Sequence, residues 1–460
     1  MGESAVVRLL GLGGGLLVWS LLLAGAGCSS EEAPDTRPNF LFLLADDQRA
    51  DTIAAYGNRF IETPQLDRLV FRGFSFRSNY CLGSNSGAVC VPSRAMIHSG
   101  LAYPRISHDL EGVETLPEIL RQQGYVTFAT GKWHNQRPSF QRRFSQAKKV
   151  FFGGMRDHTK VLIEDLSIDG VLHNKRIGEK FSSQLFADAV IGFLKTHEKG
   201  KPFYAYVAFT APHDPRQPPE SFRDRYYEER PPLPKNFLPQ HPFDNGWLVV
   251  RDEELAAWPR TREVISDQLA EYYGLISHLD EQIGRILEAL EASGEADNTY
   301  IVYAADHGLA MGSHGLLGKQ SLYEHSMRAP LIILGPGIPG GESSESLTYL
   351  LDIFPTILGL AGAPVPSPID GRSLAPIWRG ETDSVREALF LSFTDSMRAV
   401  RYDRWKLIVY PQVNHLQLFN LGLDPNEIVN LADDPAQADR IAQLKVLLEE
   451  WRSTWETIRL

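Results

Sequence analysis

The sequence predicts an α/β protein with a large, mostly parallel or mixed central sheet, flanked by helices and followed by a small α+β C-terminal subdomain. Short apolar runs with the length and bulk of buried strands alternate with segments of helical periodicity. This alternation is typical of a mostly parallel sheet covered on both faces. From about Ala388 the pattern changes to closely spaced strand-like pairs, which indicates a second, smaller unit.

The strands predicted for the large sheet are apolar runs rich in aliphatic and aromatic residues, as buried strands are. They are Phe40–Ala45, Tyr125–Ala129, Phe203–Phe209, Tyr300–Ala305 and Leu331–Leu334.

The helices are indicated by caps and by apolar periodicity. Thr115 and Glu118 have the spacing of a capping box, which opens a short helix. A second helix is predicted over Ser183–His197. The clearest pattern runs over Glu263–Glu291, where apolar residues recur at steps of three and four until Gly294 ends the helix.

The C-terminal subdomain is predicted from a hairpin pattern. Arg398–Arg401 and Trp405–Tyr410 flank the turn-forming Tyr402–Arg404, and Gln417–Leu421 could add a third strand. Ile441–Trp455 is predicted as a closing helix. Within the large unit, Pro212–Pro259 holds many prolines and few long apolar runs, so we expect a long surface loop that serves as a lid.

The N-terminus is predicted to be a targeting segment. Leu9–Leu23 is nearly all apolar or glycine and is too short for a membrane span, so it is typical of a secretory signal. Ala24-Gly25-Ala26 is a site for ordinary cleavage. Alternatively, Gly25–Cys28 resembles a bacterial lipobox without the usual leucine, which would leave Cys28 lipidated, and Ser29–Pro38 would then be its tether.

These patterns divide the chain into a signal peptide at 1–28, a tether at 29–37, a large domain at 38–385 and a C-terminal subdomain at 386–460. We expect an exported protein that is periplasmic, secreted, or anchored to the membrane as a lipoprotein.

Charge and cysteine content exclude some classes of protein. Lys and Arg number 46 against 57 Asp and Glu, and the net charge of −11 argues against nucleic acid as the main partner. Besides Cys28 only Cys81 and Cys90 are present, which excludes a disulfide scaffold. One disulfide between Cys81 and Cys90 is the alternative to a functional Cys90.

Polar residues follow four of the predicted strands, at the point where each strand ends. Ligands of open α/β sheets bind beyond the carboxyl ends of the strands, so these side chains are expected to converge on one site. They are Asp46-Asp47, Gly131-Lys132-Trp133-His134, His213-Asp214 and Asp306-His307-Gly308.

Two features suggest what that site does. Asp46, Asp47 and Asp306 are hard oxygen ligands, which suit Ca²⁺ or Mg²⁺ better than zinc. A helix cap would explain one of the paired aspartates, not both. Pro92 fits the first turn of a helix, so Cys90 would stand just before a helix N-terminus, where free N–H groups and a nearby arginine attract an anion.

The run Cys90-Val91-Pro92-Ser93-Arg94, followed by Ser99-Gly100, resembles the signature of the formylglycine-dependent sulfatases. Asp46-Asp47, Gly131–His134 and Asp306–Gly308 resemble further motifs of that family, although Ser99 stands where threonine is usual and Asn135 where leucine is usual. The remaining motifs that carry the resemblance are Pro212-His213, Gly318-Lys319, Tyr323-Glu324 and Arg328-Ala329-Pro330.

The resemblance implies the alkaline-phosphatase-like fold and a sulfate-ester hydrolase. A formylglycine-generating or sulfatase-maturating enzyme would oxidise Cys90 to formylglycine, whose hydrate attacks the sulfur. A cation, Ca²⁺ rather than Mg²⁺, would be held by Asp46, Asp47, Asp306, His307 and the modified Cys90. The resemblance further implies that Arg94, Lys132 and Lys319 hold charge on the nucleophile and the sulfate, that His213 is the general acid and that His134 takes a proton.

The substrate is expected to be a sulfated sugar or polysaccharide, with choline- or aryl-type sulfates as alternatives. Asp214 and Arg216 are candidate substrate contacts, and Arg156–His158 a weaker one. The rival functions are a phosphate or phosphonate ester hydrolase of the same superfamily and an inactive glycan-binding relative.

Overall fold

The computed structural model of the protein describes residues 36–455, so the predicted signal peptide and most of the predicted tether lie outside the described residues. No helix in the described part is long and apolar enough to cross a membrane.

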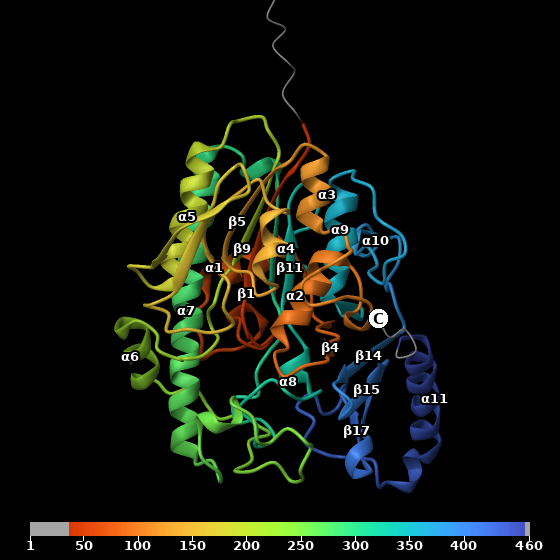
Figure 1. The fold of residues 1–460 in the computed structure, drawn as a ribbon. Helices are drawn as coiled ribbons and strands as arrows, with labels where there is room; N and C mark the ends of the chain where they lie inside the picture. The colour runs from red at the N-terminus through yellow and green to blue at the C-terminus, as the bar shows by residue number, and fades with distance from the viewer. Residues whose placement is uncertain (1–35, 456–460) are drawn as a thin grey trace, which may run out of the picture. The chain divides into compact units, whose positions relative to one another are not determined.

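A mixed ten-stranded sheet forms the centre of the fold (Figure 1). Its middle strands β10, β1, β9, β5 and β6 are parallel, whereas β11 and β7 run antiparallel to their neighbours. In spatial order the strands are β12 (Glu342–Ser344), β2 (Phe74–Phe76), β11 (Leu331–Leu334), β10 (Thr299–Ala305), β1 (Asn39–Ala45), β9 (Phe203–Ala208), β5 (Val126–Lys132), β6 (Gln146–Phe151), β7 (Leu162–Leu166) and β8 (Leu172–Ile177).

The five predicted strands are all present, and the predicted fold class is confirmed. β1 lies between β9 and β10 and every one of its residues is buried, which explains its unbroken apolar sequence. Strands β6, β7 and β8, which end the sheet on one side, were not predicted. Most of β8 is exposed and its sequence Leu-His-Asn-Lys-Arg-Ile is mainly polar, so it carries no buried-strand pattern.

Helices cover both faces of the sheet (Figure 1). One side holds α1 (Pro64–Arg72), α5 (Ser182–Thr196), α6 (Glu220–Glu228) and α7 (Arg262–Ser293), of which α1, α5 and α6 contact α7. The other side holds α2 (Cys90–Ser99), α3 (Leu116–Gln122) and α9 (Ile353–Leu360), which contact one another. Shorter helices are α4 (Arg137–Gln141), α8 (Glu324–Met327) and α10 (Ala375–Trp378).

The predicted caps are present. Thr115 and Glu118 form the capping box of α3, and Gly294 ends α7 with a φ of 79°, a left-handed conformation that glycine adopts without a steric penalty.

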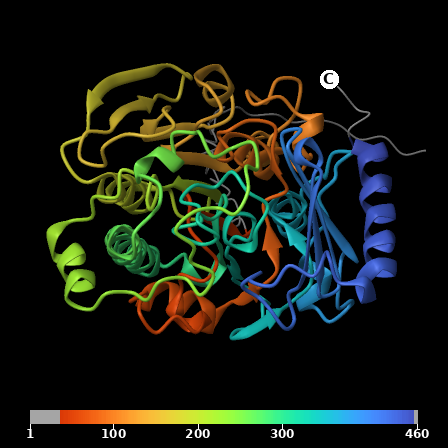
Figure 2. The ribbon, with the colours of Figure 1, turned by 90° about the horizontal axis from the view of Figure 1, so that it is seen from below.

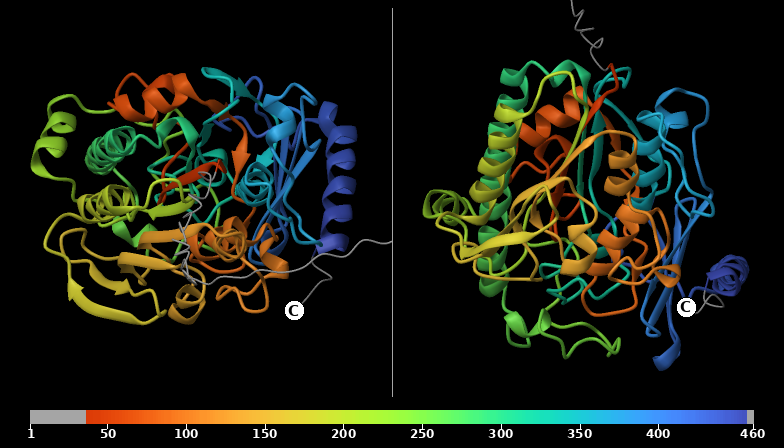
Figure 3. Two further views of the ribbon diagram at one scale, coloured as in Figure 1. Left: turned by 90° about the horizontal axis from the view of Figure 1, so that it is seen from above. Right: turned by 45° about the horizontal axis from the view of Figure 1, so that its top comes forward.

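A second sheet forms the C-terminal part, and α11 (Ala438–Trp455) packs on it. Figures 2 and 3 show this sheet and α11 on the side of the large sheet away from β7 and β8. Trp451 of α11 stacks on Phe390 with ring centroids 5.6 Å apart. In spatial order the strands are β17 (His415–Asn420), β16 (Trp405–Tyr410), β15 (Met397–Tyr402), β14 (Ala388–Phe393) and β4 (Gly83–Ser84).

Strand β4 links the N-terminal part of the chain to this second sheet. It lies only a few residues before Cys90 in the sequence, and it pairs in parallel with β14. Gly83 is required there, since a Cβ atom on it would lie 1.8 Å from the Ser392 carbonyl oxygen. A two-stranded sheet of β3 (Asn79–Tyr80) and β13 (Thr348–Tyr349) adds to this junction. The described residues belong to one compact unit, and the proposed boundary at residue 385 stays a prediction.

The expected lid segment Pro212–Pro259 is not a loop throughout. It contains α6 and a 3₁₀ turn at Glu253–Leu255. Helix α6 was missed because it buries only Tyr226 and is otherwise almost entirely polar. In Figure 1 the part of the segment after α6 lies at the bottom of the view, below α8.

Candidate active site

The adjacent parallel strands β1 and β10 end in the predicted metal ligands. Ala45 pairs with Ala305 in register, so Asp46-Asp47 and Asp306-His307 emerge side by side. The Asp47 amide donates to Asp306 Oδ1 at 3.0 Å. Asp47 has a φ of 69°, a sharp left-handed turn directly after the strand.

The three carboxylates form a buried cluster. Ligand atoms of Asp46, Asp47 and Asp306 lie within 4.8 Å of one another, and so do those of Cys90, Asp306 and His307. Burial and the charge of Asp46 raise the pKa of Asp306 to about 7. Burial opposes the positive charge of His307, but Asp306 and Asp47 raise its pKa to about 9.

This cluster fits a divalent cation. Within residues 36–455, the buried atoms Asp46 Oδ1 and His307 Nε2 form no hydrogen bond and have only ion-pair contacts, to Arg94 Nη2 at 3.3 Å and to Asp47 Oδ1 at 3.2 Å. His307 Nδ1 lies 3.0 Å from the Gly308 carbonyl oxygen and donates to it, so Nε2 is the nitrogen left for a metal. Oxygen donors with one imidazole suit Ca²⁺ or Mg²⁺.

Cys90 is the first residue of α2, one position later in the helix than its sequence context predicted. Its Sγ lies 3.2 Å from His134 Nδ1 and 3.7 Å from Lys132 Nζ. Burial opposes ionisation of the thiol, but the positive charge of Lys132 helps to hold its pKa well below the ordinary value. Cys81 and Cys90 are both free, so the alternative of a disulfide between them is wrong.

Arg94 and Lys132 lie behind the cysteine and face the carboxylates. Arg94 Nε is 3.1 Å from Asp306 Oδ2 and its Nη2 is 3.3 Å from Asp46 Oδ1, while Lys132 Nζ pairs with the other oxygen of Asp46. Burial opposes ionisation of Asp46, but Lys132 and Arg94 keep its pKa well below the ordinary value. Both cations are fully buried, so in this structure they stabilise the carboxylate cluster directly.

Lys319 and His213 form the opposite wall of the site. Lys319 Nζ lies 3.0 and 2.9 Å from the two carboxylate oxygens of Asp47 and 3.0 Å from His213 Nε2. Burial would lower the pKa of Lys319, but Asp47 and Asp252 raise it well above the ordinary value. Since the ammonium donates to His213 Nε2, the imidazole accepts there.

His134 follows β5 with a φ of 69°. Burial lowers its pKa, which favours a neutral imidazole that can accept a proton from position 90. Gly154 packs against this ring, and a Cβ atom on it would lie 2.7 Å from His134 Nε2.

These residues open onto a cavity of ≈ 310 Å³. Four of the predicted site residues line this cavity together, namely Cys90, His134, His213 and Lys319. The other lining residues are Gly87, Ala88, Gly154, Met155, Val250, Arg251, Asp252 and Gln320.

The two candidate substrate contacts are less exposed than expected. Asp214 forms a two-pronged ion pair with Arg251, and Arg216 donates to Gln268 of α7. Neither Asp214 nor Arg216 lines the cavity, whereas Arg251 does. Their role as substrate contacts stays a prediction.

The three further candidates, Arg156–His158, have different contacts. Arg156 donates to the Lys160 carbonyl and Asp157 accepts from Thr159, so both side chains stabilise the turn in which they lie. His158 is buried, and its Nε2 lies 3.0 Å from the His213 carbonyl oxygen, so it holds the backbone of the neighbouring histidine.

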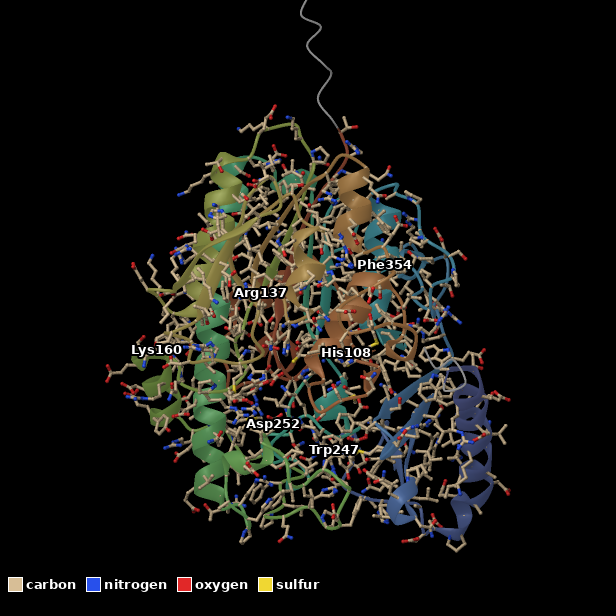
Figure 4. All side chains as sticks on the ribbon, viewed as in Figure 1. His108, Arg137, Lys160, Trp247, Asp252 and Phe354 are labelled. Carbon is tan, nitrogen blue, oxygen red and sulfur yellow. The ribbon has the colours of Figure 1, made fainter. Side chains whose placement is uncertain are left out.

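Sequence reasoning missed Arg251, Asp252 and Gln320. The first two belong to the segment predicted as a lid, and Figure 4 shows Asp252 and Trp247 on that segment between α7 and the C-terminal sheet. For Arg251 and Asp252 the only signal in the sequence was their location in this long Pro-rich segment.

Comparison with known proteins identifies the family of the chain. The family model "Sulfatase" matches residues 38–363, and the model "N-sulphoglucosamine sulphohydrolase, C-terminal" matches residues 312–454. An N-acetylglucosamine-6-O-sulfatase of Bacteroides thetaiotaomicron is 28% identical, with 96% of this chain and 91% of the relative covered. An arylsulfatase of Clostridium perfringens is 27% identical, with 90% and 94% covered.

Solved structures give the same picture. A protein in complex with its substrate D-glucosamine-2-N,6-O-disulfate superposes with a TM-score of 0.76 at 26% identity, covering 92% of this chain and 98% of that one. The phosphonate monoester hydrolase of Agrobacterium radiobacter, at 23% identity, shares the fold with a TM-score of 0.75 and covers 91% and 96%. The chain therefore belongs to the sulfatase family and is a sulfuric ester hydrolase with the alkaline-phosphatase-like fold.

Proposed function

We propose that this enzyme hydrolyses sulfate monoesters on sulfated sugars, with a formylglycine made from Cys90 as nucleophile and Ca²⁺ as cofactor. The observation that carries the proposal is the position of Cys90. It lies at the cavity wall, 3.2 Å from His134 Nδ1 and in one group of possible metal ligands with Asp306 and His307.

The cation would be held by Asp46, Asp47, Asp306, His307 and the modified residue 90. It would polarise the sulfate oxygens and stabilise the ionised nucleophile. The hydrated formylglycine would supply the hydroxyl that attacks sulfur, and a maturation enzyme of the formylglycine-generating or sulfatase-maturating type would make it.

The chain's own side chains supply the proton transfers. In this structure His213 Nε2 accepts from the Lys319 ammonium. To act as general acid, His213 first binds a proton at Nε2, which the negative charge of a bound sulfate ester favours, and then donates it to the oxygen of the leaving alcohol. The Lys319 ammonium then turns to the sulfate and stabilises the negative charge on that side. His134 accepts a proton at residue 90, which it faces through Nδ1, so that sulfate can depart. Arg94 and Lys132 keep Asp46 ionised, and Arg94 also pairs with Asp306.

A sulfated sugar is the substrate class that the relatives favour. The names of two of the similar proteins specify N-acetylglucosamine-6-O-sulfate chemistry and glucosamine disulfate as substrate. The cavity rim also offers Arg251, Asp252 and Gln320, which are polar groups able to bind sugar hydroxyls.

Three measurements test this function. The peptide that carries Cys90, from protein produced beside a maturation enzyme, should lose about 18 Da relative to cysteine. The matured protein should then cleave sulfated saccharides, and activity confined to aryl or choline sulfates would reject the sugar assignment. A higher kcat/KM on a phosphonate monoester than on any sulfate ester would favour the rival that the shared fold allows.

We also propose export with the lipobox-like segment as its signal. If Cys28 is lipidated, metabolic labelling with palmitate should mark the wild-type protein and not C28A. Label-free, secreted protein of equal activity would instead support cleavage at Ala24-Gly25-Ala26.

A further inference from the structure

Three consecutive residues of the lid segment contact the residues around His213 and Lys319. Arg251 pairs with Asp214, the neighbour of His213. Asp252 accepts from the Gln320 side chain at 2.9 Å, and Glu253 contacts the backbone just before Lys319.

Glu253 has the most specific contacts of the three. Its carboxylate accepts from the Leu317 amide, at 3.1 Å to Oε1 and 3.0 Å to Oε2, and from the Gly318 amide at 2.8 Å to Oε1. Arg260 pairs with the same carboxylate and also donates to the Glu253 carbonyl oxygen at 2.9 Å. Glu253 is 3% exposed, so these bonds lie in a dry environment where they are strong.

The lysine segment depends on such contacts because it has no regular structure of its own. Residues 315–322 form neither helix nor strand, although all of them are buried, so their N–H groups need side-chain or backbone acceptors. Glu253 accepts from the amides of Leu317 and Gly318, and Gln320 Oε1 accepts from the Lys319 amide at 3.0 Å.

The approach of the lid to this segment is close. A Cβ atom on Gly318 would lie 2.8 Å from the Asp252 Cβ and 3.1 Å from Glu253 Oε1. The backbone next to Lys319 therefore packs directly against the side chains of Asp252 and Glu253.

The position of Lys319 decides what its ammonium can do. Its Nζ lies between Asp47 and His213 at the cavity wall, at the end of a flexible four-carbon stem. A shift of the backbone by about 1 Å would move the charge away from both partners, and errors of that size are costly in catalysis.

We propose that Glu253 is a positioning residue that fixes Lys319 for the reaction through the backbone of Leu317 and Gly318. This inference rests on the proposed function, in which Lys319 stabilises charge on the sulfate. It adds the lid to the catalytic apparatus, because the lid then determines the geometry of the site as well as its access.

A double-mutant cycle tests the inference in full-length, matured enzyme. E253Q keeps one acceptor oxygen but presents an NH₂ group toward backbone N–H donors, so it should lower kcat/KM on a sulfate ester about tenfold. In the K319A background the same change should have almost no further effect, because the residue on which Glu253 acts is gone. E254Q is the matched control, since Glu254 is the exposed next residue, and it should behave like wild type.

The binding of inorganic sulfate, measured by calorimetry, provides a second readout. E253Q should weaken sulfate binding in the presence of Lys319 and leave it unchanged in K319A. E253D, which keeps the charge on a shorter side chain, should recover part of both losses and serves as the folded variant if the melting temperature of E253Q is too low.

The outcomes separate the inference from the proposed function. Equal losses from E253Q with and without Lys319 would show a general structural role and overturn the inference. If wild type binds sulfate with the expected coupling but cleaves no sulfate ester, the proposed function fails and the positioning role stands.

Discussion

The sulfur of Cys90 lies 3.2 Å from Nδ1 of His134, while Cys81, the other described cysteine, makes its sulfur contact at 3.7 Å with the Gly83 carbonyl oxygen. One thiol faces a nitrogen and a lysine, and the other faces a carbonyl group in the core. The two cysteines therefore differ in reactivity before any maturation.

We expect unmatured protein to be alkylated at Cys90 and not at Cys81. The thiolate is the reactive form, and the surroundings of Cys90 hold its pKa well below the ordinary value, whereas burial raises the pKa of Cys81 to about 12. Brief treatment with iodoacetamide at neutral pH, followed by peptide mass analysis, measures both sites in one sample. Equal labelling of the two cysteines in folded protein would contradict the structure.

We expect Ca²⁺ to stabilise the enzyme, and more so at pH 8 than at pH 5. Without a cation the raised pKa of Asp306, about 7, means that the folded state binds a proton there which the unfolded state has lost. Its contribution to stability is thus present below about pH 4 and is lost as the pH rises through about 7. A bound cation replaces that proton, so its benefit grows over the same range.

The measurement is the melting temperature with EDTA and with added Ca²⁺ at both pH values, and an increase of several degrees is expected at pH 8. D306N should lose most of this increase. D297N, which changes an exposed aspartate, should retain it. An increase that is the same at both pH values would contradict the raised pKa of Asp306, and a full increase in D306N would reject its role as a ligand.

The sequence predicted the carboxylates at the centre of this site because they lie directly after the ends of strands. Asp46 and Asp306 each come directly after a buried apolar run, and parallel neighbours bring such ends together. Cys90 and Lys319 do not follow strands of the large sheet. Cys90 was indicated by its predicted position at a helix N-terminus and by the family resemblance, and Lys319 by the resemblance alone. The sequence could not predict that Glu253 reaches the amides of Leu317 and Gly318, because this contact joins two irregular segments that are far apart in the chain.

The helices and strands, like the site, could be predicted only where their sequence pattern reflects burial. The buried strand β1 and the periodic helix α7 were predicted because their patterns reflect burial. Helix α6 and strand β8 lie at the surface, where polar residues are compatible with helix, strand or loop.

We expect K406M to destabilise the protein strongly although Lys406 does not line the active-site cavity. Lys406 Nζ is buried between Glu324 Oε1 at 3.0 Å and Glu427 Oε1 at 2.9 Å, and it connects the C-terminal sheet to α8. Its loss would leave two buried glutamates facing each other, which costs about 3–5 kcal/mol of unfolding free energy.

Urea denaturation measures this cost, and K445M is the control because Lys445 is an exposed lysine of α11. The control should change the free energy of unfolding by less than about 0.5 kcal/mol. Similar stability of K406M and K445M would show that the ion pairs with Glu324 and Glu427 contribute nothing net.

We expect R251A to weaken the binding of a sulfated saccharide more than it slows turnover. Arg251 lines the cavity and pairs with both Asp214 and Asp252, so its removal leaves these two carboxylates without their partner at the rim. An anionic substrate would then meet uncompensated negative charge. KM for a sulfated saccharide should rise about tenfold, as expected for the loss of a hydrogen bond to a charged group, while kcat changes little.

A small aryl sulfate that does not reach the rim should show a smaller rise in KM. The control is R230A, which changes an exposed arginine of the same lid segment that does not line the cavity. If R251A lowers kcat and leaves KM unchanged for both substrates, Arg251 acts on the catalytic residues through Asp214, and its contact with substrate is rejected.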